Sequence, residues 1–158
     1  MKWIDIPPVW LAGFIALTYL IGQIGWLAVR PAFTLFGIDF AENQFGWGGE
    51  MFIAAGLLAM VAAVFEMGRH NTTVIPHREA DALVQTGIFA FSRNPIYLGD
   101  VLVLVGCVIL FKAALALLLV PVFIYIIRQR FIFPEEDRLA AKFGEDFEDY
   151  CELTRRWI

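Results

Sequence analysis

The sequence lacks the motifs that mark many cofactor and metal sites in soluble enzymes. It has no G-x-G-x-x-G after a predicted strand, no phosphate-binding P-loop, no H-E-x-x-H and no Cys-x-x-Cys. Its two cysteines, Cys107 and Cys151, are far apart in the chain, so a disulfide framework is not expected and both are interpreted as small buried side chains. A Rossmann-type cofactor domain is therefore unsupported.

Charged residues are also few. Twelve Lys and Arg against sixteen Asp and Glu give a net charge of −4, which offers no support for nucleic-acid binding. Hydrophobic residues make up 59% of the chain, above the ~45–50% that is usual for soluble domains. They occur in blocks, and the mean hydropathy is +0.68. This composition indicates a membrane protein.

The apolar blocks have the length of transmembrane helices. Residues 9–29 carry no charge, and a helix of that length spans ~31 Å, about the thickness of the hydrocarbon core. The block is too long for a signal peptide, and Arg30-Pro31 is expected to end its helix. A second span is predicted over 47–66. The tract from 95 onward is too long for one untilted crossing, which favours two helices, 95–111 and 113–131, that meet near Lys112.

Basic residues orient these spans. The segment 67–94 and the segment after residue 127 are rich in Arg, whereas residues 30–50 carry one Arg and three acids. The positive-inside rule places both basic segments in the cytoplasm, which requires two crossings between them. We therefore expect an all-α domain over residues 1–158 with four transmembrane helices and both termini cytoplasmic, in a bacterial inner membrane.

The C-terminal segment has an amphipathic pattern. Leu139, Phe143, Phe147 and Tyr150 recur at helical spacing and form one apolar stripe. Pro134 suits a first helical turn, and the acids that follow it complement the positive helix start. One amphipathic helix is predicted over 134–153, either lying on the membrane or folding over a site formed by 81–97.

Two motifs in the second half of the chain carry a family resemblance. Residues 81–97 read DALVQTGIFAFSRNPIY, close to the pattern A-L-V-x-x-G-x-Y-x-x-x-R-[HN]-P-x-Y. Residues 135–150 read EEDRLAAKFGEDFEDY, close to E-E-x-x-L-x-x-x-F-G-x-x-[YF]-x-x-Y, and the last four residues, RRWI, are similar to the usual family ending. Over residues 71–158 the chain resembles the isoprenylcysteine carboxyl methyltransferases and their phospholipid-methyltransferase relatives.

The resemblance implies S-adenosylmethionine as the cofactor and a lipidic or amphipathic acceptor from the bilayer. It implies that Arg130 contacts the acceptor. Asn94 stands where the family often has His, and an amide hydrogen-bonds but does not titrate. The residues expected to bind the cofactor are Asp81, Ala82, Leu83, Val84, Phe89, Arg93, Asn94, Pro95, Ile96, Tyr97, Glu135 and Glu136.

Such a cofactor needs three kinds of partner. Its ammonium requires a carboxylate, for which Glu135 or Glu136 is available, and its carboxylate requires donors such as those at a helix beginning at Pro95. Its adenine requires a flat apolar slot, for which Phe89 is a candidate together with Leu83 and Val84. Because a sulfonium methyl is already electrophilic, the enzyme has mainly to align the reactants and exclude water.

Simpler interpretations remain open for each of these residues. Arg93, Arg128 and Arg130 fit interfacial anchors, Tyr97 an aromatic belt, and Phe89 and Phe91 packing. The two glutamates fit ordinary first-turn acids. Asp100 lies just inside a span, where acids are functional candidates. Glu66, His70 and His77 are too loosely spaced to favour a metal site, and none is predicted.

The acceptor is the least determined feature. A carboxylate or thiolate acceptor needs no general base, whereas an amine must first lose a proton, and no convincing base is apparent. This favours an isoprenylcysteine-type acceptor over phospholipid N-methylation, which is the alternative within the same reaction class. Two further alternatives are a nicotinamide-dependent sterol reductase and a non-catalytic four-helix membrane protein that binds a partner.

Overall fold

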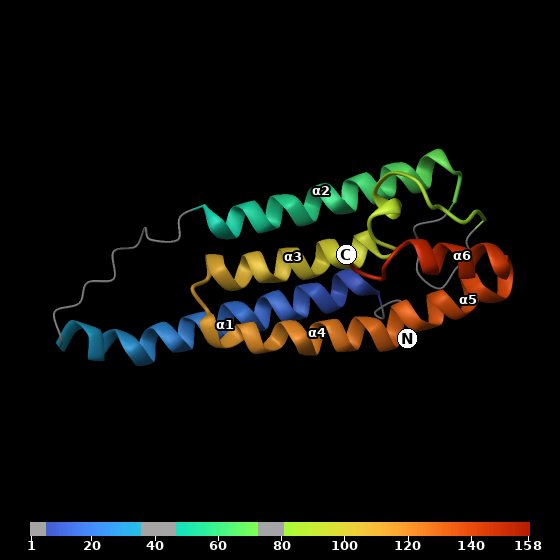
Figure 1. Cartoon of the computed structure of the whole chain (residues 1–158). Helices are drawn as coiled ribbons and strands as arrows, with labels where there is room; N and C mark the ends of the chain where they lie inside the picture. Colours follow the sequence, from blue (N-terminus) through green and yellow to red (C-terminus); the bar gives the residue numbers. More distant parts are fainter. Residues whose placement is uncertain (1–5, 36–46, 73–80) are drawn as a thin grey trace.

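The computed structural model describes residues 6–35, 47–72 and 81–158, and within these ranges it is all-α, as predicted. The long helices lie side by side, and the short helices at residues 87–90 and in the C-terminal region lie at one end of them (Figure 1). The helices in chain order are α1 (Pro7–Leu35), α2 (Gly48–Arg69), η1 (Gly87–Ala90), α3 (Pro95–Leu110), η2 (Ala114–Leu118), α4 (Leu119–Ile127), η3 (Arg128–Ile132), α5 (Phe133–Phe143) and α6 (Glu145–Leu153).

Three stretches are long and apolar enough to cross a membrane: Pro7–Gly25 within α1, Gly48–Arg69, and Ala114–Phe143. Helix α3 is apolar but has only 16 residues, about 24 Å of helix. The structure therefore supports three candidate spans rather than the four that were expected. A fourth crossing, by α3, stays a prediction.

The first helix is longer than predicted. It continues through Pro31 and ends at Leu35, so the expectation that Arg30-Pro31 would terminate it was wrong. Proline is tolerated within helices of membrane proteins because neighbouring groups and local adjustments satisfy the carbonyl left without its N–H partner. Of the loop predicted over 31–49, residues 36–46 lie outside the described part of the chain.

The reversal between α3 and α4 lies where it was predicted, at residues 111–113. Its backbone is turned by Lys112, which adopts a left-handed conformation with φ of 53°. Ala113 N–H then donates to the carbonyl of Val108 at 3.0 Å, as in a helix C-cap. This position is usually glycine, and no glycine or proline marks the turn in the sequence, so the prediction rested on the length of the apolar tract and the distribution of charge.

Helices α2 and α3 pack backbone to backbone along two pairs of glycines. A Cβ added at Gly56 would lie 2.6 Å from the carbonyl oxygen of Gly99, and one at Gly49 would lie 2.8 Å from that of Gly106. Small residues allow helices in membranes to approach closely. This contact holds the start of α3 beside the end of α2.

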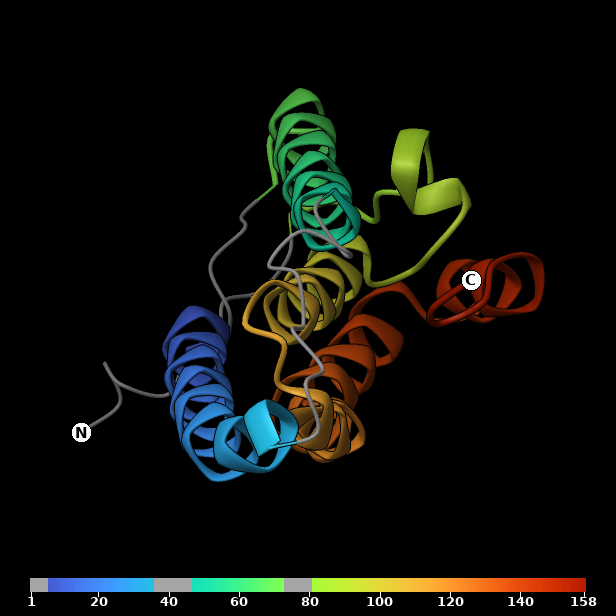
Figure 2. The ribbon, with the colours of Figure 1, turned by 90° about the vertical axis from the view of Figure 1, so that its left-hand side faces the viewer.

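Aromatic and branched side chains form the core between α1, α3 and α4. The buried cluster consists of Tyr97, Leu104, Phe123, Ile127, Phe131 and Ile132. Phe14 of α1 packs on Phe123 with a centroid distance of 5.1 Å, and Tyr97 stacks on Phe131 at 6.4 Å. Figure 2, seen along the bundle, shows α1, α2 and α4 around α3 and α6 set to one side.

The C-terminal region departs from the single amphipathic helix that was predicted. The helix predicted over 113–131 does not end at 131 but continues into α5 through a π-turn, in which Phe133 N–H donates to the carbonyl of Arg128. Pro134 has no N–H to continue the regular bonding, and the wider turn accommodates this. Gly144, with φ of 54°, then separates α5 from α6.

Candidate functional site

The two sequence motifs meet at the end of the bundle where α3 begins. Asn94 occupies the N-cap position of α3 with φ of −130° and no side-chain capping hydrogen bond, and Pro95 occupies the first turn, as predicted. One turn later, the hydroxyl of Tyr97 donates to Glu135 Oε2 of α5 at 2.9 Å. The predicted adjacency of the segment 81–97 and the glutamate pair is therefore confirmed.

The last residues of the chain form part of the same site. The N–H of Arg93 donates to the carbonyl of Arg155 at 3.0 Å. The carbonyl of Arg156 accepts from the hydroxyl of Ser92 at 3.3 Å and from the amide of Asn94 at 3.2 Å. Asn94 thus uses one of its two amide N–H donors on the tail, and the other is not used by this contact.

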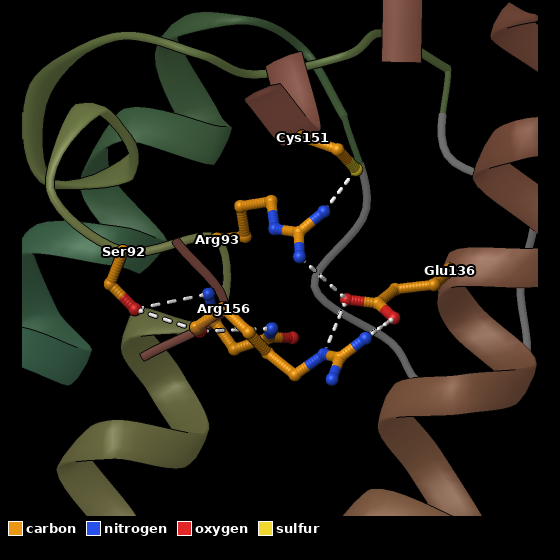
Figure 3. Close-up of polar contacts among 6 residues, drawn as sticks. Ser92, Arg93, Glu136, Cys151 and Arg156 are labelled. Carbon is orange, nitrogen blue, oxygen red and sulfur yellow. Dashed lines mark hydrogen bonds and ion pairs between the residues drawn. The ribbon is translucent and has the colours of Figure 1, made fainter. Parts of the chain in front are cut away.

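Glu136 lies at the centre of an ion network (Figure 3). Its carboxylate accepts from Arg156 Nε at 2.9 Å and Nη2 at 2.7 Å, and Arg93 Nη2 lies 3.6 Å away. These hydrogen bonds raise the pKa of the Arg156 guanidinium. Arg93 also contacts the sulfur of Cys151 on α6. Glu136 therefore already balances positive charge, and it holds two guanidinium groups in place.

A pocket opens beside this network, with about 250 Å³ of space including its open side. One part of its wall is polar and charged, and the other is apolar. The residues lining it are Arg93, Asn94, Glu135, Glu136, Leu139, Phe147 and Tyr150. Carboxylates and cationic or amide donors in one wall match the ammonium and carboxylate of an amino-acid group.

One buried atom in this wall has no partner. The Nε–H of Arg93 is buried and has no hydrogen-bond acceptor, although the side chain is 12% exposed and lines the pocket. A buried donor without an acceptor costs free energy unless a ligand or water supplies one. The residues present thus fit a ligand that brings an oxyanion to Arg93, as the carboxylate of S-adenosylmethionine would.

The loop before α3 is held from both sides. Toward α2, the hydroxyl of Thr86 donates to the buried Glu66 Oε1 at 2.5 Å and lies 2.9 Å from His70 Nε2. Toward α6, the hydroxyl of Tyr150 donates to the carbonyl of Phe89 at 2.6 Å, and burial raises the pKa of this phenol. Tyr150 therefore stays a neutral donor.

The aliphatic and aromatic residues expected around adenine lie elsewhere. Val84 is buried, Leu83 and Phe89 are partly buried, and none of them lines the pocket. The N–H groups of Asp81 and Ala82 donate to the hydroxyl of Thr72 at 3.0 and 3.4 Å. The apolar wall is instead made by Leu139, Phe147 and Tyr150, which the sequence pattern had assigned to an amphipathic stripe.

Arg130, expected to meet the acceptor, is directed toward α1. Its guanidinium carbon lies 5.2 Å from the ring centroid of Trp10, and it does not line the pocket. Ile96 is half-buried and Pro95 is buried at the start of α3. The structure thus brings Arg93, Asn94, Tyr97, Glu135 and Glu136 together and leaves the other predicted residues around them.

Some site residues were missed from the sequence. Arg156 was noticed only as part of the terminal RRWI, and Cys151 as a buried thiol. The terminal motif was the available signal, but nothing in its spacing indicates which arginine turns inward. No cluster of three metal-binding side chains occurs among residues 6–35, 47–72 and 81–158, and His77 lies outside them.

Comparison with known proteins identifies the family. The profile of the phospholipid methyltransferase family matches residues 45–146, which include α2, α3 and the glutamate pair. No curated protein and no solved structure matches the chain. The match covers more than half of the sequence and ends within the second motif. The chain therefore belongs to the phospholipid methyltransferase family, and it is an integral, multi-pass membrane methyltransferase that uses S-adenosylmethionine.

Proposed function

We propose that the pocket between α3, α5 and α6 holds the amino-acid part of S-adenosylmethionine. The observation that carries this proposal is the charge pattern of the wall, with Glu135 on Tyr97 and an unsatisfied Arg93 beside it. Glu135 would accept the ammonium, because it lines the pocket beside Arg93 and its carboxylate is held by the Tyr97 hydroxyl. Arg93 and Asn94 would face the carboxylate.

The chain's residues then act by positioning. The bound cofactor supplies a methyl group that is already electrophilic, so no residue has to activate the donor. Tyr97 fixes the rotamer of Glu135, and the tail keeps Asn94 and Arg93 in one orientation. Tyr150 and Phe147 are buried and line the pocket, where their rings would help to exclude water from the bound cofactor.

The predicted cofactor-binding residues that do not line the pocket are also part of the proposal. Other parts of the cofactor would reach the loop before α3, which is held between Glu66 and Tyr150 beside the pocket. The residues proposed there are Asp81, Ala82, Leu83, Val84, Phe89, Pro95 and Ile96. The proposed cofactor-binding region is thus residues 71–158 of one domain.

The proposed acceptor is a lipidic or amphipathic molecule that reaches the site from the bilayer. Among the described pocket-lining residues, the phenol of Tyr150 is neutral and the carboxylates are engaged by Tyr97 or arginine. An acceptor that is already ionised, such as a carboxylate or thiolate, needs no base from this set. Arg130 would contact its anionic group, which guanidinium binds bidentately. Phospholipid N-methylation is the alternative.

Calorimetry of the purified chain in detergent tests the cofactor site. S-adenosylhomocysteine should bind, and Glu135→Gln should weaken the affinity by about tenfold, since one charge-assisted interaction contributes about 1.5–3 kcal/mol. Glu145→Gln, an exposed first-turn acid of α6, is the matched control and should bind as the native chain does. No heat with the native chain at millimolar ligand would exclude the proposed site.

A labelling experiment tests the acceptor class. Radiolabelled methyl transferred into an extracted lipid pool, followed by mass spectrometry, should give a methyl ester or thioether. Methylated phosphatidylethanolamine as the product would replace the proposed acceptor with the alternative.

A further inference from the structure

Two guanidinium groups converge on one aromatic ring outside the pocket. The guanidinium carbons of Arg128 and Arg156 each lie 5.2 Å from the ring centroid of Phe133. Arg128 opens the π-turn at the end of α4, and Phe133 closes it, so the wider turn brings the two side chains together. Stacking on a ring orients a guanidinium and leaves its edge available for hydrogen bonds.

Within the described part of the chain, the positive charge of Arg128 is not balanced by an ion pair. Arg156 is paired with Glu136, but no carboxylate among the described residues forms an ion pair with Arg128. The Nε–H of Arg128 is buried and has no acceptor. Arg93 adds a third guanidinium around Glu136. A partly buried guanidinium without an acceptor costs free energy, which a bound anion would recover.

The position of Arg128 indicates which anion can reach it. Residues 113–127 carry no charge, so Arg128 is the first charged side chain after the apolar part of the span Ala114–Phe143. It therefore lies at the level where lipid headgroups meet water. An anion approaching Arg128 along the bilayer is the phosphate or carboxylate of an amphiphile.

We propose that Arg128 and Arg156, stacked on Phe133, form a binding site for the oxyanion headgroup of an amphiphile such as a phosphate monoester lipid. None of these three residues lines the pocket, and Arg156 connects the site to the pocket through its ion pair with Glu136. The site is separate from Arg130, which is stacked on Trp10 of α1. The inference deepens the proposed acceptor route from the bilayer, but binding at this site does not require the cofactor.

Binding of a short-chain phosphate lipid tests the proposal. The purified full chain in dodecyl maltoside is titrated with dihexanoyl phosphatidic acid, dihexanoyl phosphatidylcholine and inorganic phosphate. Phosphatidic acid should bind at least tenfold more tightly than either of the other two. Inorganic phosphate bound as tightly as phosphatidic acid would overturn the assignment to an amphiphile.

Single substitutions of arginine test whether Arg128 forms the binding site. Arg128→Gln should weaken phosphatidic acid binding about tenfold or more, because a bidentate charged contact is lost. Arg128→Lys should retain part of the native affinity for phosphatidic acid, because it keeps the positive charge. Arg155→Gln is the matched control: its side chain is exposed on the tail, and it should change the affinity less than twofold. Equal losses in Arg128→Gln and Arg155→Gln would overturn the proposal, because they would reflect net charge alone.

Folding and cofactor binding are followed in the same samples. Arg128→Gln should keep the native unfolding temperature and the native affinity for S-adenosylhomocysteine, and Arg128→Lys covers the case in which the Gln variant unfolds. If the native chain does not bind S-adenosylhomocysteine, this result counts against the proposed function alone. If the native chain does not bind phosphatidic acid, this result overturns the present inference alone.

Discussion

At the scale of single residues, neighbouring side chains have different partners. Glu135 and Glu136 are adjacent in the sequence, but side chains one residue apart on a helix point about 100° apart. Glu135 therefore meets Tyr97 of α3, whereas Glu136 meets Arg156 of the tail and Arg93 of the loop. This divergence separates the carboxylate proposed to bind the cofactor from the one that pairs with the guanidinium groups.

Replacing Tyr97 with Phe should weaken cofactor binding. The change removes the hydrogen bond to Glu135, and such bonds to charged groups contribute about 1.5–3 kcal/mol. We expect the affinity for S-adenosylhomocysteine, measured by calorimetry, to fall by about tenfold. Tyr125→Phe is the matched control, because Tyr125 is 62% exposed on α4. Unchanged affinity in Tyr97→Phe would remove this hydrogen bond from the site.

Gly87 and Gly144 both adopt left-handed conformations, but the space around them differs. Gly87 has φ of 60°, and a Cβ there would lie 2.8 Å from the carboxylate carbon of Glu66; Gly144 has φ of 54° and open space around it. Alanine at either position carries backbone strain of about 1–2 kcal/mol. Gly87→Ala should cost about a further 1.5–3 kcal/mol because it displaces Glu66 from Thr86. Thermal unfolding in detergent measures the stability of both variants, and equal losses of stability in Gly87→Ala and Gly144→Ala would contradict this account.

At the scale of elements, close helix contact positions the site. The glycine pairs of α2 and α3 bring the end of α2 beside the start of α3. This places Glu66 where it can hold Thr86 and, through the loop, the segment that enters α3. The π-turn has a comparable role on the other side, since it sets the angle at which α5 presents Glu135 and Glu136.

Adding a methyl group at this contact should destabilise the bundle. At Gly56 the new Cβ would overlap the carbonyl of Gly99, and overpacking of this kind costs about 1–3 kcal/mol. Gly68→Ala in the same helix meets no atom within 4 Å and should instead stabilise by about 0.5–1 kcal/mol. Thermal unfolding of both variants measures the difference, and a stabilised Gly56→Ala would refute the contact.

At the scale of the whole molecule, α5, α6 and the loop before α3 lie at one end of the long helices (Figure 1), and the polar contacts of the site connect these segments. The loop before α3, the end of α4, α5, α6 and the tail all meet there. The turn at Lys112 lies at the other end of α3. This arrangement suits a site open to water on one side and to the bilayer on the other.

Reporter fusions test the proposed four-crossing topology. A reporter after Lys112 should be periplasmic, and one after Ile158 should be cytoplasmic, because α3 and the span Ala114–Phe143 would each cross the membrane. A fusion after His70 should match the C-terminal fusion. If the His70 and Lys112 fusions report the same side, α3 does not cross.

The sequence by itself determined the features that are local. Uncharged runs predicted the helices, Asn94-Pro95 predicted the start of α3, and the spacing of apolar blocks predicted a reversal near Lys112. Two motifs, separated by one helical pair, were enough to indicate the family that the profile match establishes.

Only the tertiary structure decided which polar groups meet. Pattern and spacing could not distinguish Glu135 from Glu136, show that Arg130 is directed to Trp10, or bring Arg156 to Glu136 across 20 residues. They also missed that α4 continues into α5 and that Gly144 divides the C-terminal helix. The reason is physical: helical periodicity and solvation act over a few residues, whereas side-chain pairing depends on how whole helices are rotated and packed against one another.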